Sequence, residues 1–260
     1  MKILAFEQST SQASLAISED GRIIASAKWN SSIRDSIDLF TTLSPVLEKE
    51  NISLTDIEVF ASSLGPGSFT GIRIALTTAK TMALPYKKQI FAVSSGELLA
   101  QDSGKEYVGV MGDARRNRLW GATFRKKSEL GVYEKVNEYK LFSFEEAADF
   151  FDGCEQIIST DYCRLEKVIN EFKLKGLVQH DVIPTAQTLC DIVYKKMSAS
   201  IESDKLEPVY LHPAVVVQKN KCVNAKMAGM PLAVFIICRV SPKCSAFPKS
   251  VFIQSWLNIS

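Results

Sequence analysis

The stretch SSLGPGSFTGIRIALTTAKTMA at residues 62–83 restricts the possible folds more than any other part of the chain. It follows an apolar, β-branched run at 57–64, and its glycine-rich turn leads directly into a segment with helical periodicity. Only Arg73 and Lys80 are charged in that segment, whereas a surface helix normally has a broad polar face. We therefore expect a strand–turn–helix unit whose helix is covered on more than one side.

Strands and helices alternate around this unit. The pair Asp20-Gly21 lies between two apolar runs and predicts a hairpin. The expected strands are 2–6, 13–18, 22–29, 57–64, 90–93, 107–111, 119–125, 132–141 and 156–159, and the expected helices are 32–50, the segment ending at Pro85, 95–100, 144–151, 162–172 and 186–198. This order predicts two α/β lobes with mixed sheets, at residues 1–102 and 103–213.

The last part of the chain, residues 214–260, differs in charge from the rest. Residues 213–260 hold six of the 31 basic residues and none of the 29 acidic ones. Its run LAVFIIC is too short to span a bilayer, so a packed strand and an appendage without fixed structure both fit. The opening MKILAFEQSTS indicates a first strand rather than an export signal, so we expect a cytoplasmic protein with reduced cysteines and no membrane contact.

The glycine turn fails both common nucleotide motifs. The Walker loop needs a lysine after its last glycine, and the dinucleotide fingerprint needs a glycine where Thr70 stands. A helix amino terminus can still bind an anion, but a capping Ser68 or Thr70 satisfies the same N–H groups, and both interpretations stay open. The possible anion or nucleotide contacts are Ser9, Thr10, Gly65, Gly67, Ser68, Thr70, Gly71, Asp113 and Arg115.

Two helical segments carry wider apolar faces than a single core contact requires. The expected helix 32–50 is apolar over about half its cylinder, and the helix after the glycine turn has barely a polar strip. A core position and an interface with another chain both explain such faces. The predicted partner contacts are Ile33, Ile37, Leu39, Phe40, Leu43, Leu47, Arg73, Ile74, Thr77 and Lys80.

Complete catalytic sets are missing from the sequence. It has no paired-histidine metal motif and no Gly-x-Ser-x-Gly elbow, and its two histidines, His180 and His212, lie in no recognisable motif. Asp113 ends an apolar run and precedes three arginines, so a water-mediated metal contact, a salt bridge and an arginine contact to RNA phosphate all remain possible. We expect no metal site.

Several segments together resemble the TsaB (YeaZ) family. They are the Ser9-Thr10 turn, SLGPGSFTGIRIALTTAKTMAL, AVSSGELLA, the DARR turn at 113–116 and PVYLHP at 208–213. The resemblance implies a two-lobe actin-like (ASKHA, RNase H-like) fold and a non-catalytic role in making threonylcarbamoyladenosine next to the tRNA anticodon. It implies binding to a TsaD-like catalytic subunit and a TsaE-like ATPase, with tRNA reached through the complex.

The resemblance further implies a homodimer through the first-lobe helices, on a surface for which TsaD competes. It implies no cofactor of the chain's own, with ATP or ADP only at the interface of the complex. Members usually carry Asp where Glu7 stands and often a histidine near Asp35, and the tail 214–260 is not expected of the family. The alternative is an ATP-dependent kinase or ATPase of the same fold, and a peptidase is the least favoured.

Overall fold

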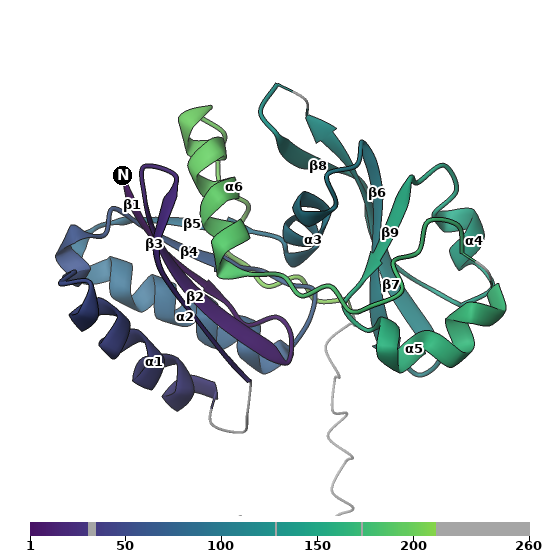
Figure 1. Ribbon diagram of the computed structural model, residues 1–260, viewed down its shortest axis with the longest axis horizontal. Helices are drawn as coiled ribbons and strands as arrows, with labels where there is room; N and C mark the ends of the chain where they lie inside the picture. Colours follow the sequence, from purple (N-terminus) through teal and green to yellow (C-terminus); the bar gives the residue numbers. More distant parts are fainter. Residues whose placement is uncertain (31–34, 128, 173, 212–260) are drawn as a thin grey trace, which may run out of the picture. The chain divides into compact units, whose positions relative to one another are not determined.

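The computed structural model describes residues 1–30, 35–127, 129–172 and 174–211, so the tail 214–260 lies outside the described residues (Figure 1). Its first sheet has the strand order β3-β2-β1-β4-β5. Strands β1, β2 and β3 form an antiparallel meander, while β4 and β5 run parallel to β1. The strands are β1 (Lys2–Glu7), β2 (Gln12–Glu19), β3 (Arg22–Asn30), β4 (Val59–Ser63) and β5 (Gln89–Val93).

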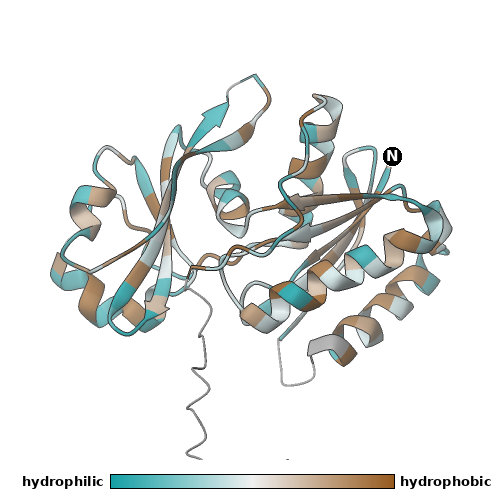
Figure 2. Ribbon diagram, turned by 180° about the vertical axis from the view of Figure 1, so that it is seen from behind, coloured by the Kyte–Doolittle hydropathy of each residue, from teal (hydrophilic) through white to brown (hydrophobic). Residues whose placement is uncertain are grey.

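Helices α1 (Asp35–Lys49) and α2 (Phe69–Ala83) cover one face of this sheet (Figure 1). Leu39 and Leu43 of α1 and Ala75 and Ala79 of α2 share one buried cluster with the strands. Figure 2 shows apolar and polar bands along both helices, as expected where one side of a helix packs on a sheet. Helix α1 continues through Pro45 without a break.

The second sheet has the order β8-β7-β6-β9, again an antiparallel meander with a parallel strand beside its first member. Both sheets thus share the strand directions of the RNase H-like fold, which confirms the predicted two-lobe class with mixed sheets. The strands are β6 (Tyr107–Arg115), β7 (Arg118–Lys127), β8 (Val132–Phe142) and β9 (Gln156–Ser159), and α4 (Ala147–Phe150) and α5 (Tyr162–Ile169) pack on one face. Short 3₁₀ turns lie at Leu54–Asp56, Leu84–Tyr86 and Asn170–Phe172.

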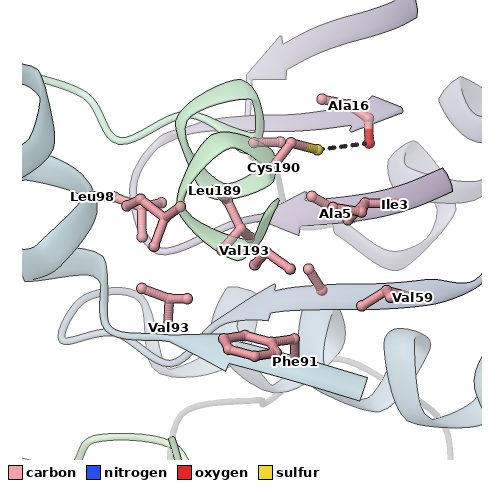
Figure 3. Close-up of a cluster of buried hydrophobic side chains, with 13 residues drawn as sticks. Ile3, Ala5, Ala16, Val59, Phe91, Val93, Leu98, Leu189, Cys190 and Val193 are labelled. Atoms are coloured by element: carbon pink, nitrogen blue, oxygen red, sulfur yellow. Dashed lines mark hydrogen bonds between the residues drawn. The ribbon is translucent and has the colours of Figure 1, made fainter. Parts of the chain in front are cut away.

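The remaining two helices cover the opposite faces of the two sheets. Helix α3 (Ser95–Ser103) lies between β5 and β6 in the chain, and its Leu99 and Ala100 pack in the core of the second sheet while its Leu98 joins the core of the first. Helix α6 (Ala186–Ser198) returns to the first sheet, where Leu189, Cys190 and Val193 lie over β1, β2 and β4 (Figure 3). The sequence did not predict that α6, which follows the strands of the second sheet in the chain, packs on the first sheet. The predicted lobe boundaries at residues 102 and 213 stay predictions.

Candidate functional site

The glycine turn lies against the end of β1 with no room for side chains. A Cβ atom on Gly67 would lie 2.1 Å from the carbonyl oxygen of Ser9, and one on Gly71 would lie 2.0 Å from that of Gln8. The backbone N–H of Ser68 also donates to the Ser9 carbonyl over 2.7 Å. These glycines are therefore needed so that two backbone segments can approach closely.

Ser68 caps helix α2. Its hydroxyl accepts from the N–H of Gly71 over 3.2 Å, and its carbonyl accepts from the N–H of Ile72 over 3.0 Å. The predicted cap at Ser68 is confirmed, whereas Thr70 is exposed and does not cap the helix. Because the turn also faces the Gln8 and Ser9 carbonyl oxygens, its surroundings disfavour an anion, and the anion contact stays a prediction.

Polar side chains at the end of β1 are enclosed rather than open to solvent. Glu7 has no exposed surface, and one of its carboxylate oxygens accepts from the N–H of Ser9 over 2.6 Å. Burial raises the pKa of Glu7, and hydrogen bonds from Ser63 and Ser9 oppose that shift only in part. Thr10 donates to the Gln12 carbonyl over 3.0 Å, whereas the buried hydroxyl of Ser9 has no hydrogen-bond partner among the described residues. The contact predicted for Ser9 and Thr10 stays a prediction.

Asp113 at the end of β6 is held by arginines. Its Oδ2 lies 3.1 Å from Arg164 and 3.6 Å from Arg115, and its Oδ1 accepts from the N–H of Arg115 over 2.6 Å. This is the salt-bridge interpretation of Asp113, with Arg164 of α5 as a partner that sequence reasoning missed. Asp161, which precedes α5, binds the same arginine over 2.5 Å. The spacing of three residues between Asp161 and Arg164 could have predicted this second ion pair, because residues three apart at a helix are neighbours.

The exposed part of α1 is apolar, but only some of the predicted contacts lie in it. Ile37 is 57% exposed and Phe40 is 48% exposed. Leu39 and Leu43 lie in the lobe's own core and cannot reach a partner directly, so these two predicted contacts are corrected. Leu47 and Ile74 are half-buried against the same core, Thr77 is exposed, and Ile33 lies outside the described residues.

Arg73 and Lys80 bind a later segment of the same chain. The Nε of Arg73 donates to the Tyr210 hydroxyl over 2.7 Å, and its guanidinium lies 3.8 Å from the centre of the Phe69 ring. Lys80 donates to the Leu206 carbonyl over 2.8 Å. These two cations therefore fix residues 206–210 along α2 while remaining exposed, which sequence reasoning missed although it singled out PVYLHP.

Further apolar side chains are exposed near these helices. They are Phe69, Leu84, Tyr86 and Tyr210, and Leu84 is the most exposed at 77%. Spacing along α2 places Arg73, Thr77, Lys80 and Leu84 on one face of the helix. We call Ile37, Phe40, Thr77 and Leu84 the α1–α2 face.

Within the residues that the structure describes, no three His, Cys, Asp or Glu side chains form a metal-binding group. None of the described helices is both long enough and apolar enough to cross a membrane. The described cysteines, Cys154, Cys163 and Cys190, are free thiols. Ser68 caps helix α2, His180 is exposed, and His212 lies outside the described residues.

The model of one family, TsaD: tRNA N6-adenosine threonylcarbamoyltransferase, matches residues 35–209. The chain belongs to this family. Among its curated relatives, "tRNA threonylcarbamoyladenosine biosynthesis protein TsaB" of Buchnera aphidicola (from Schizaphis graminum) is 32% identical over 139 residues, covering 52% of the chain and 66% of that protein. The Escherichia coli protein of the same name is 26% identical over 232 residues, covering 84% of the chain and 98% of that protein.

A solved structure, YeaZ from Pseudomonas aeruginosa, has the same fold. It superposes with a TM-score of 0.68 at 22% identity, covering 81% of this chain and 99% of that one. The resemblance to the TsaB/YeaZ family is thus confirmed. The chain spans just under two thirds of the Buchnera relative and almost the whole of the E. coli one.

Proposed function

We propose that this chain is a non-catalytic subunit that binds and supports a TsaD-type catalytic protein during formation of threonylcarbamoyladenosine in tRNA. Membership of the family and relatives named for this pathway support the proposal. The proposal places the chain in the cytoplasm, where it reaches tRNA through the complex. Any ATP or ADP belongs at the interface of that complex, and a TsaE-like ATPase joins it.

The packing at the end of β1 carries the non-catalytic part of this proposal. A phosphate-transferring site needs open N–H donors and an accessible carboxylate near the transferred group. Here the glycine turn contacts the carbonyl oxygens of Gln8 and Ser9, Glu7 is fully buried, and Asp113 is held by Arg115 and Arg164. This arrangement supports a role in binding rather than in phosphate chemistry.

The α1–α2 face supports the binding part. Ile37, Phe40 and Leu84 expose apolar surface, whose burial against a partner is worth about 25 cal/mol per Å². In the proposal a TsaD-type subunit covers this face, and a second copy of the chain covers it when that subunit is missing. Competition between the two partners follows because both use the same apolar residues.

Depletion of the protein from its own cell tests this function. Threonylcarbamoyladenosine should disappear from tRNA and return when the wild-type gene is supplied, while the purified chain alone should form no product. Calorimetry of the chain with ATP and magnesium tests the alternative. Tight binding that Asp113→Ala abolishes would favour an ATP-dependent enzyme and contradict the proposal.

A further inference from the structure

The turn between β6 and β7 carries cationic side chains in an unusual backbone conformation. Arg116 and Asn117 have φ angles of +53° and +55°, and Arg115 and Arg118 pair on either side of them. Two-residue hairpin turns of this kind favour asparagine and glycine, because other side chains are crowded in the left-handed region. Arginine at position 116 is therefore not explained by the requirements of the turn.

A fourth arginine joins this turn from α5. Arg164 lies 3.1 Å from the same oxygen of Asp113 that Arg115 approaches to 3.6 Å. The carboxylates of Asp113 and Asp161 therefore fix two guanidinium groups side by side. Arg115 nevertheless keeps 73% of its side chain exposed, so this ion pair leaves most of its donors free for another group.

The charges around the turn leave an excess of cations. Arg118 donates to the Leu141 carbonyl over 3.1 Å and lies near Glu146, whose pKa is lowered chiefly by the Ser143 N–H and further by Arg118. Among the described residues, Arg116 has neither an ion pair nor a hydrogen bond through its side chain. With Asp113, Asp161 and Glu146 all counted, the four arginines still outnumber the carboxylates.

We propose that Arg115, Arg116, Arg118 and Arg164, the arginine cluster, bind phosphate groups of the tRNA backbone. The proposal rests on the proposed function and extends it, because it gives this subunit its own contact with tRNA. Guanidinium groups match phosphate oxygens with paired hydrogen bonds. Residues 113–118 expose no large apolar side chain, whereas the core of a protein interface is apolar, so RNA phosphate fits this turn better than an acidic protein.

Binding of the full-length chain to an unmodified tRNA transcript, measured by fluorescence anisotropy at several salt concentrations, tests the cluster. Arg116→Gly should weaken binding about fivefold at low salt, the upper end for an exposed ion pair. It should also lower the slope of log Kd against log salt by about one. Because glycine suits the turn, Arg116→Gly should melt at the same temperature as the wild type or slightly above it.

Two matched variants separate the charge from the backbone. Asn117→Gly places glycine in the same turn without removing a charge, so it should melt like Arg116→Gly and bind tRNA like the wild type. Lys87→Ala combined with Lys105→Ala removes two exposed cations elsewhere and should weaken binding less than Arg116→Gly alone. Equal loss from the lysine pair, or wild-type binding by Arg116→Gly, would overturn the proposal.

The outcomes also separate this inference from the proposed function. If the wild-type gene restores threonylcarbamoyladenosine and Arg116→Gly binds tRNA normally, the cluster is refuted and the proposed function stands. If Arg116→Gly loses tRNA affinity while depletion of the protein leaves the modified adenosine unchanged, the cluster stands and the proposed function is refuted. Wild-type binding to an acidic protein but not to tRNA would also refute the cluster.

Discussion

The ion pair between α3 and α6 is buried, and its removal gives the sharpest stability prediction. The Nζ of Lys196 lies 2.8 Å from a carboxylate oxygen of Glu97, and neither residue is more than 8% exposed. Burial raises the pKa of Glu97 to about 7, although Lys196 lowers it in part. The two helices cover different sheets, so this pair links the halves of the fold.

The direction of the pH dependence follows from that pKa. Because it lies above the ordinary 4.5, protonated Glu97 stabilises the fold below pH 4.5, and this contribution is lost as the pH rises through about 7. The difference between the two pKa values corresponds to about 3 kcal/mol. Lys196→Met removes the group that lowers the pKa of Glu97, so the variant takes up a proton on folding even above pH 7, and its stability keeps falling there while that of the wild type levels off.

Lys196→Met should be about twice as damaging at pH 8 as at pH 5. At pH 5 the protonated acid loses only a hydrogen bond worth about 1 kcal/mol, whereas at pH 8 it must also hold its proton about one pH unit above the wild-type pKa, which adds about 1 kcal/mol. The corresponding decreases in melting temperature are about 6 °C and 3 °C. Adding Glu97→Gln to Lys196→Met should recover the part of the loss that appears only at pH 8, because the amide needs no proton to stay neutral.

Thermal unfolding followed by circular dichroism at the two pH values measures these differences. Lys195→Met is the matched control, because Lys195 pairs with Asp191 at the surface and should contribute less than about 1 kcal/mol at either pH. Equal destabilisation by Lys196→Met at pH 5 and pH 8 would refute the argument. A double variant as unstable as Lys196→Met alone would refute it as well.

Three further changes test the packing of α1 and α2. Gly71→Ala forces a methyl group against the Gln8 carbonyl and should cost about 3 kcal/mol; an unchanged melting temperature would show that the turn is not closed. Ser68→Ala should cost about 1 kcal/mol by removing the cap, and chemical denaturation should show it as a lower midpoint at constant slope. Leu39→Ala should cost about 3 kcal/mol while leaving the partner affinity of the folded chain unchanged, and weaker binding by folded Leu39→Ala would restore it as an interface residue.

Local features could be predicted well from the sequence because neighbouring residues decide them. Asp20-Gly21 marks the hairpin turn, and Asp20 and Gly21 indeed have φ angles of +48° and +79°. Ser68 after two glycines predicts a helix cap by the same local chemistry. The order of apolar strand segments and helical segments predicted the two mixed sheets in the same way.

Contacts between distant parts of the chain could not be predicted in this way. Periodicity shows that Leu39 and Phe40 are apolar helix residues, but it does not tell that Leu39 enters the core while Phe40 remains exposed. From the sequence, Arg73 is predicted to contact a partner. In the structure its side chain instead donates to the hydroxyl of Tyr210, which lies 137 positions later in the chain. The packing of α6 on the first sheet, and of most of α3 on the second, could not be predicted for the same reason.

Binding between this chain and its TsaD-type partner tests the central claim most directly. Titration by isothermal calorimetry should give a complex with the wild type, and Ile37→Asp combined with Phe40→Asp should weaken it at least about tenfold without lowering the melting temperature, since both residues are exposed. Asp113→Ala should bind the partner like the wild type. Undiminished binding by the Ile37→Asp/Phe40→Asp variant, or no complex with the wild type at all, would contradict the account.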